Sequence, residues 1–328
     1  MKVKILFLSL VFLLSGCNKS SPPEPVSRTD FALGTFVSAR VHGENAESAL
    51  DEVFARLFEI EQLASAKNPD SELFYVNQNA YEREVTVSEE LFYLLETGLF
   101  YSSLTDGAFD ITLGSIVELW GIGTENVAVP DAEELAEALE NSGFRYLVLN
   151  ENELSVRFWK EGLRIDLGAL AKGYAADEMK RILLENGVTN AILDLGGDII
   201  TISDNDGKGW RIGIADPRNL GEICAIVRVS DKAVVTSGDY ERFFVQDGVD
   251  YHHIFDSATG FPADSGIISV TVIAESAMLA DALSTAFFVM GVERAIEFAR
   301  TMPEIGYILI DRDMNIYNSE NIEIEIIR

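Results

Sequence analysis

The chain has 328 residues, with 25 lysines and arginines against 54 aspartates and glutamates, so its formal net charge is −29 at pH 7. This excess of negative charge repels nucleic-acid backbones and anionic lipid, and it argues against nonspecific binding to either. Only two cysteines are present, Cys17 and Cys224. A framework of disulfide bonds is therefore excluded, and Cys224 is expected to be a small buried residue.

The N-terminus has the features of a targeting segment. Lys2 and Lys4 precede an apolar run over 5–14, which is too short to span a bilayer as a helix. Leu14-Ser15-Gly16-Cys17 then resembles the lipobox of bacterial lipoproteins, which are cleaved before the cysteine and acylated on it. We expect residues 1–16 to be a signal peptide and Cys17 to carry the lipid, palmitate included.

The protein is therefore expected in the cell envelope, lipid-anchored on the extracytoplasmic (periplasmic) side, with the leaflet left open. An ordinary secretory signal, in which Cys17 has no role, is the alternative. Residues 17–28 contain a cluster of serine and proline and are expected to be a flexible tether. Residues 29–328 then form one large domain or two intimately packed lobes.

Hydrophobic periodicity and turn residues predict the elements of this region in chain order. Helices are expected over 46–64, 88–104, 113–120 and 131–141, then from the 166–174 segment to about 187, around 281, and over 293–301. Strands are expected over 28–41, 146–149, 155–158, 191–194, 199–203, 210–215, 223–229, 233–237, 242–245, 251–255, 269–274, 307–311 and 322–326. Grouped strands with interspersed helices, lacking regular βαβ alternation, predict an α+β fold.

The helix around 281 carries a pair of oxygen donors. Asp281 and Thr285 are four residues apart, so a helix presents their carboxylate and hydroxyl on one face. Hard oxygen donors suit Mg²⁺, which usually takes one or two protein carboxylates beside a substrate phosphate. The alternative is a buried helix with a satisfied aspartate and a threonine that bonds to its own backbone.

Four further segments carry residues that could take part in catalysis or ligand binding. Residues 106–110 are expected to form a turn that carries two carboxylates. Residues 196–198, Gly-Gly-Asp, could let a ligand come close to the backbone, or they could form an ordinary tight turn. Residues 166–174 place a glycine and Lys172 at a helix entrance, where free amides favour an anion. In 251–262, a strand would point His252 and His253 to opposite faces, and imidazole suits a general base. Each segment alone also has an ordinary structural explanation.

Nine segments, taken in order, resemble the ApbE-type FAD:protein FMN transferase family. They are 33–35, 69–73, 106–110, 166–174, 195–199, 210–217, 236–242, 251–260 and 280–286. The resemblance covers nearly all of 28–328, and a lipobox is common in the family. It implies a T-fold-like architecture of mixed, largely antiparallel sheets with packed helices.

The resemblance also implies an activity. The family binds FAD and Mg²⁺ (with Mn²⁺ as the alternative metal), transfers FMN to a Thr or Ser hydroxyl of a partner protein, and releases AMP. Acceptors carry an Asp-Gly-x-(Ser/Thr)-Gly-Ala-(Ser/Thr) motif and are Rnf- or Nqr-type subunits or FMN-binding domains. The implied metal positions are Asp281, Thr285 and the Ala169 carbonyl, with His253 as the base.

The implied flavin-nucleotide positions form a larger set. They are Leu33, Ala108, Phe109, Asp110, Asp166, Lys172 and Phe255. The family's flavin-stacking tyrosine should fall near Lys67, where no aromatic residue stands, and this loss is expected to weaken retention of FAD. Two alternatives to the transferase therefore stay open: an FAD pyrophosphatase that yields FMN and AMP, and a flavin-binding lipoprotein without catalysis.

Overall fold

The computed structural model describes residues 24–203 and 207–327. The predicted signal peptide, Cys17 and the tether as far as residue 23 lie outside the described residues. The described chain has the expected α+β fold, and all its named strand pairs are antiparallel. Within these ranges, no helix combines the length and the apolar character needed to cross a membrane.

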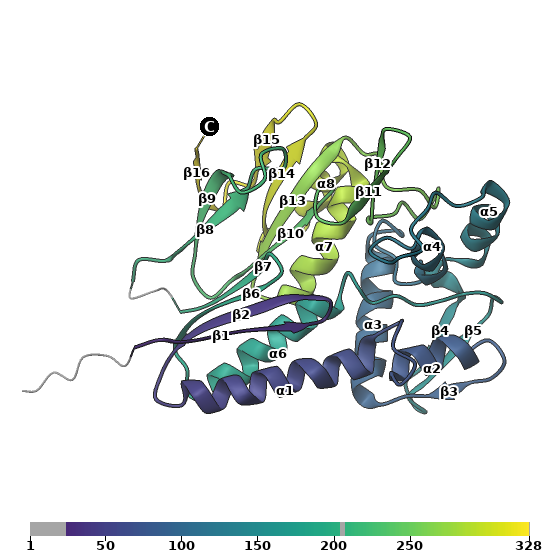
Figure 1. Ribbon diagram of the computed structural model, residues 1–328, viewed down its shortest axis with the longest axis horizontal. Helices are drawn as coiled ribbons and strands as arrows, with labels where there is room; N and C mark the ends of the chain where they lie inside the picture. Colours follow the sequence, from purple (N-terminus) through teal and green to yellow (C-terminus); the bar gives the residue numbers. More distant parts are fainter. Residues whose placement is uncertain (1–23, 204–206, 328) are drawn as a thin grey trace, which may run out of the picture.

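The largest sheet has eight strands in the order β1-β2-β6-β7-β10-β13-β14-β15 (Figure 1). In chain order, these strands are β1 (Val26–Ala32), β2 (Thr35–His42), β6 (Asn190–Leu195), β7 (Asp198–Ile202), β10 (Ala233–Gly238), β13 (Ile267–Ala274), β14 (Gly306–Asp311) and β15 (Ile316–Asn318). All eight residues of the central strand β13 are buried, because both faces of the sheet are covered there.

Helices pack on one face of this sheet and a small sheet packs on the other. The helices are α1 (Ala46–Ala64), α6 (Ala171–Glu185) and α7 (Ala277–Met290), followed by the short α8 (Val292–Ala299). The small sheet contains β16 (Glu323–Ile326), β9 (Ile223–Val229) and β8 (Trp210–Ala215). Alternation along β14 shows this division, since Leu309 packs in the helix-side core while Ile308 and Ile310 pack against the small sheet.

A second packed region lies between β2 and α6 in the sequence. It contains α2 (Glu72–Asn79), α3 (Glu89–Leu104), α4 (Gly114–Trp120), α5 (Ala132–Asn141) and the sheet of β3 (Val85–Thr86), β5 (Ser155–Phe158) and β4 (Leu147–Asn150). Leu91, Leu95 and Phe158 belong to the same apolar core as α6 and α7. The two regions are therefore joined by one core, which agrees with the prediction of one domain or two intimately packed lobes.

Most predicted elements are present, and the differences are local. The opening strand is a hairpin, because Leu33 and Gly34 adopt positive φ values of 52° and 72° and reverse the chain. Helix α2 was not predicted, and the strand expected over 251–255 is wrong at its end: β12 (Val249–His252) pairs with β11 (Phe243–Gln246) and stops at His252. Cys224 is buried, as predicted.

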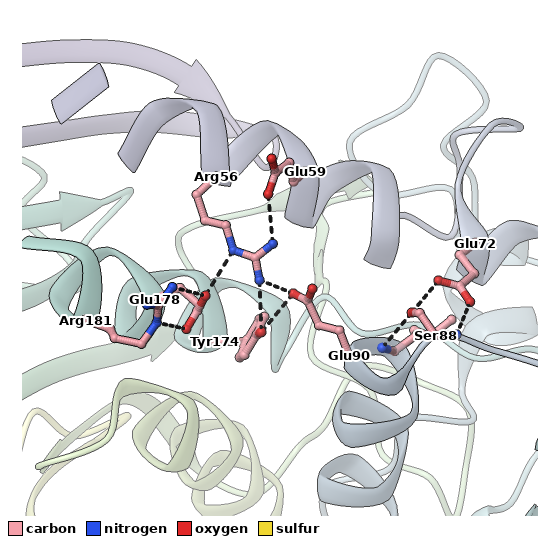
Figure 2. Close-up of polar contacts among 9 residues, drawn as sticks. Arg56, Glu59, Glu72, Ser88, Glu90, Tyr174, Glu178 and Arg181 are labelled. Atoms are coloured by element: carbon pink, nitrogen blue, oxygen red, sulfur yellow. Dashed lines mark hydrogen bonds and ion pairs between the residues drawn. The ribbon is translucent and has the colours of Figure 1, made fainter. Parts of the chain in front are cut away.

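An ion-pair network ties α1, α3 and α6 together (Figure 2). The guanidinium of Arg56 donates to Glu59 and Glu178 at 3.0 Å each, and also to Glu90. Tyr174, on the first turn of α6, donates to the same Glu90 carboxylate at 2.8 Å. Because Arg56 is only 18% exposed, these contacts are partly shielded from water and hold the beginning of α6 in place.

We predict that Arg56→Ala lowers the free energy of unfolding by about 1.5–3 kcal/mol, because it leaves Glu90 without its cation and Glu178 with Arg181 alone. Arg211→Ala is the matched control, since Arg211 pairs with Glu325 where the two side chains are 54% and 69% exposed. That variant should lose less than about 1 kcal/mol. Urea unfolding followed by circular dichroism measures both values, and equal losses would contradict the prediction.

Candidate active site

The predicted oxygen donor Asp281 lies where α7 crosses α6. Its Oδ2 accepts a hydrogen bond of 3.0 Å from the backbone N–H of Gly173. A Cβ at position 173 would stand 2.5 Å from the Ala277 carbonyl oxygen, so only glycine lets the two helices come this close. Asp281 is 3% exposed, and its other oxygen, Oδ1, accepts no hydrogen bond from any described residue.

The environment of Asp281 disfavours its negative charge. Burial raises the pKa of its carboxyl to about 7; the positive charge of Lys172 opposes this shift, and the negative charge of Asp198 adds to it. Lys172 is itself engaged by Asp198. The structure therefore contains a buried carboxylate that lacks a counter-charge of its own, which a bound cation would supply.

Two more oxygen donors are free at this helix crossing. The Gly173 N–H donates to Asp281 instead of to the Ala169 carbonyl four residues earlier, so no described residue bonds to that carbonyl. Thr285 is half-buried and its hydroxyl bonds to no described residue, while the Asp281 carbonyl accepts from Ser284 Oγ at 2.9 Å. The alternative of a threonine bonded to its own backbone is therefore not what the structure shows.

This donor set fits a hard cation. It offers a carboxylate, a hydroxyl and a backbone carbonyl, which are ligand types that Mg²⁺ accepts while it keeps several waters. Softer metals are less suited, because this donor set contains no imidazole or thiolate. No group of three or more His, Cys, Asp or Glu side chains in the described ranges could hold a metal ion, so hydroxyl and backbone oxygens would have to complete the site. Asp281, Thr285 and Ala169 would be the residues that hold Mg²⁺.

Lys172 is the second residue of α6 and forms a buried ion pair with Asp198. Burial acts to lower the pKa of Lys172, but the charges of Asp198 and Asp281 outweigh it and hold the pKa above its ordinary value. Asp198 is 1% exposed and follows the turn at Gly196 and Gly197, whose φ values are 68° and 100°. The Lys172 ammonium therefore remains charged near Asp281, and its side chain is 22% exposed.

The β1–β2 turn reaches the same place. A Cβ on Gly196 would lie 2.1 Å from Thr35 Oγ1, so β2 starts directly against the Gly-Gly turn. The neighbouring Gly34 carbonyl accepts from Arg242 Nη2 at 3.4 Å. Leu33, at the tip of this turn, is half-buried. The structure thus brings 33–35, 172 and 196–198 together, although they are far apart in the sequence.

The two adjacent histidines have different roles. His252 is occupied on both ring nitrogens: Nε2 lies 3.2 Å from the Ala263 carbonyl, and Nδ1 accepts from the Ile254 N–H at 3.3 Å. Its ring also packs edge-on against Phe288, with ring centroids 5.2 Å apart. His252 is therefore a structural residue, which confirms that the two side chains face different environments.

His253 keeps one ring nitrogen free. Its Nδ1 lies 3.2 Å from the Arg242 carbonyl oxygen, which can only accept, so Nδ1 carries the proton. No described residue bonds to Nε2, which then has an open lone pair. Burial lowers the pKa of His253 to about 4, and the charge of Arg242 adds to this effect, so the imidazole is neutral at pH 7. This is the protonation state that a general base requires.

The remaining predicted positions lie on loops that are bonded to one another. Asp110 accepts from the Thr112 N–H at 2.8 Å and from the Phe144 N–H at 3.1 Å, while the Asp166 N–H donates to the Ile111 carbonyl at 2.8 Å. Ser257 Oγ donates to the Gly107 carbonyl at 2.7 Å. The 106–112, 166–170 and 256–260 loops therefore form one connected rim.

Three of these positions would contact a nucleotide through their backbone and not through their side chains. Phe109 is buried in the main core, and Phe255 packs on Trp120 with ring centroids 5.8 Å apart, so neither ring is available to stack on a ligand. Their backbone groups, and that of the half-buried Ala108, are what a nucleotide would meet. Lys67 is exposed and brings no aromatic ring to the site.

Two contributors were missed by sequence reasoning. Arg242 bonds to the Gly34 turn and orients His253, yet within 236–242 it was read only as part of a family motif. Asn77 donates to the Ile165 carbonyl and accepts from the Ile165 N–H, both at 2.8 Å, and so holds the start of the 166–170 loop. It lies on the unpredicted helix α2, and no sequence signal for this contact was available.

Comparison with known proteins gives consistent matches over this whole region. A sequence model of the ApbE family matches residues 33–309. An FAD:protein FMN transferase of Treponema pallidum is 37% identical, over 95% of this chain and 92% of its own. One from Klebsiella pneumoniae is 33% identical, over 87% and 88%. The solved structure of an ApbE protein from Thermotoga maritima has a TM-score of 0.85 at 38% identity, over 90% and 97%.

We predict that the stability of the metal-free protein falls as pH rises from about 4 to about 7. The folded state holds the Asp281 proton up to about pH 7 while the unfolded state releases it near the ordinary value of 3.8, so stability is highest below that value and declines as pH rises. In Asp281→Asn this decline should be smaller. Urea unfolding at pH 5 and pH 8 in EDTA measures it, and an identical decline in the variant would contradict the prediction.

Proposed function

The chain belongs to the ApbE family, and we propose that it is a Mg²⁺-dependent FAD:protein FMN transferase. It would cleave FAD, attach FMN through a phosphoester bond to a Thr or Ser hydroxyl of an exported partner protein, and release AMP. Relatives in Treponema pallidum and Klebsiella pneumoniae carry the name of this activity.

One observation carries the proposal: a free carboxylate oxygen and an unprotonated imidazole nitrogen belong to one set of contacting segments. Asp281 Oδ1 and His253 Nε2 are both left without partners among the described residues. Lys172 is close enough to both groups for its charge to influence the pKa values of Asp281 and His253. This arrangement supports the proposal that a metal donor and a base act around one cationic side chain.

The reaction needs a proton acceptor and charge neutralisation. The acceptor oxygen would attack the FMN phosphorus as His253 Nε2 takes the hydroxyl proton. The anhydride bond would break, with its electron pair leaving on the AMP phosphate. Mg²⁺, when bound, would supply a positive charge that lowers repulsion between the diphosphate and the incoming oxygen. Lys172 would add a fixed ammonium beside the same oxygens, which matters in a chain whose net charge is −29.

The pyrophosphatase remains a second candidate because of Lys67. It is exposed and stands where the family resemblance places a stacking tyrosine, so nothing at this position would shield bound FAD from water. Water in place of the protein hydroxyl would then give FMN and AMP with the same residues. A flavin-binding lipoprotein without catalysis is disfavoured, because simple binding requires neither the free Nε2 of His253 nor the free Oδ1 of Asp281.

The acceptor and the location complete the proposal. We propose an acceptor with an Asp-Gly-x-(Ser/Thr)-Gly-Ala-(Ser/Thr) motif, carried by an Rnf- or Nqr-type subunit or an FMN-binding domain. Lipidation at Cys17 would hold the enzyme on the extracytoplasmic side of the membrane, where an exported acceptor is accessible. The predicted tether of 17–28 is shorter than expected, because β1 already begins at Val26; the part that precedes β1 would let the domain reach the acceptor.

We predict that His253→Ala lowers kcat by about 10²–10⁴, because the acceptor hydroxyl loses its base, while FAD still binds. His252→Gln is the matched control, since both nitrogens of His252 are already used by the backbone, and it should keep kcat within about tenfold. The measurement is FMN transfer to an acceptor protein, followed by intact mass. A comparable loss in both variants would contradict the assignment of the base.

We also predict that the purified protein releases AMP from FAD when Mg²⁺ is present, and that EDTA or Asp281→Ala abolishes the release. Chromatography of nucleotides measures AMP, and mass spectrometry of a co-expressed acceptor detects added FMN. AMP release that requires the acceptor supports the transferase, whereas equal release without it supports the pyrophosphatase. Undiminished AMP release by Asp281→Ala would refute the metal assignment.

A further inference from the structure

We propose that Asp177 is a positioning residue that sets the cation-binding geometry of Asp281 from a site one helical turn away. This inference rests on the proposed function. The Asp177 carboxylate extends from α6 to the N-terminus of α7 and accepts three hydrogen bonds there. Oδ1 accepts from the Ala277 N–H at 2.7 Å, while Oδ2 accepts from Ser276 Oγ at 2.7 Å and the Met278 N–H at 3.1 Å.

These bonds are half of a two-point junction between the helices. Asp177 lies four residues after Gly173 on α6, and Ala277 lies four residues before Asp281 on α7. Residues four apart share a helix face. The contacts Asp177–Ala277 and Gly173–Asp281 therefore lie one helical turn apart along the interface of two antiparallel helices. The contact at Asp177 contains three hydrogen bonds, and the contact at Asp281 contains one.

The three hydrogen bonds of Asp177 determine where α7 places Asp281 against α6. The first N–H groups of a helix have no partner inside it, and a carboxylate from another element satisfies them while matching the helix dipole. Ser276, whose own hydroxyl accepts from the Leu279 N–H at 3.2 Å, is held by the same carboxylate. Asp177 thereby fixes both the rotation and the axial position of α7 against α6.

The consequence for the cation site follows from its donor set. Asp281 and Thr285 belong to α7, while the Ala169 carbonyl immediately precedes α6. A cation bound by all three would span the junction, so its affinity depends on the relative position of the two helices. Asp177 touches none of these donors, and its effect would pass only through the packing of α6 on α7.

The test is direct binding of Mn²⁺, as a probe for the divalent cation, to the purified full-length protein in the absence of FAD and acceptor. Isothermal titration or the electron paramagnetic resonance signal of free Mn²⁺ gives the Kd. We expect Asp177→Ala to weaken binding at least tenfold and Asp177→Asn to have a smaller effect, because the amide oxygen can still accept. At saturating Mn²⁺, AMP release should recover to within a few fold of the parent, with the KM for FAD nearly unchanged.

Glu185→Gln is the matched control. Glu185 is on the same helix and pairs with Arg181 at the surface, so its replacement should leave the Kd for Mn²⁺ unchanged. If Asp177→Ala does not fold, Ser276→Ala serves as the milder variant, since it removes one of the three bonds to Asp177 together with the Ser276 cap on the Leu279 N–H. Thermal unfolding of each variant, recorded in EDTA, separates loss of stability from loss of affinity.

The outcomes separate this inference from the proposed function. If the parent protein does not bind Mn²⁺, the metal site itself fails. If the parent binds Mn²⁺ and the folded Asp177 variants bind it equally well, Asp177 is merely a helix cap and the positioning role is overturned. Weakened binding that high Mn²⁺ rescues, together with an unchanged Glu185→Gln, supports the role.

Discussion

The close packing of α6 against α7 is the constraint on which the rest of the site depends. It brings the Asp281 carboxylate out of water and against the backbone of α6, which Gly173 permits by having no side chain. Among the described residues, only the Gly173 N–H donates a hydrogen bond to that carboxylate. In an ordinary helix start, this N–H would bond to a backbone carbonyl or to water. One contact therefore creates two features of the site: a carboxylate short of a counter-charge and a free carbonyl at Ala169.

Turns at one end of the antiparallel sheet lie around this helix junction. The β1–β2 turn and the β6–β7 turn meet where Thr35 packs against Gly196, and the two ends of the β11–β12 hairpin contribute Arg242 and His253. The β1–β2 and β6–β7 turns are anchored by β2, β6 and β7, whose buried side chains hold these two turns to the core. A site built from loops can thereby have defined geometry.

The charge of the protein explains why this geometry is needed. A chain with 54 acidic and 25 basic side chains repels a diphosphate, so binding such a substrate requires local positive charge. Lys172 provides one cation, but its ion pair with Asp198 offsets much of that charge. A divalent cation on the free oxygen of Asp281 would restore the balance. The Mg²⁺ dependence that we propose for this chain would thus have a physical reason.

The sequence by itself determined most of the elements and the family, and it nominated the candidate donors. Periodicity predicted α1 with its observed bounds, and helical spacing alone put Asp281 and Thr285 on one face. These features depend on neighbours within a few residues, which is the range over which helix and strand patterns carry information. The tertiary structure alone decided that Gly173 takes the N–H bond of Asp281, that Asp198 pairs with Lys172, and that His253 rather than His252 keeps a free nitrogen. Those outcomes come from contacts between segments far apart in the chain, where burial and the choice of hydrogen-bond partner depend on how the elements pack.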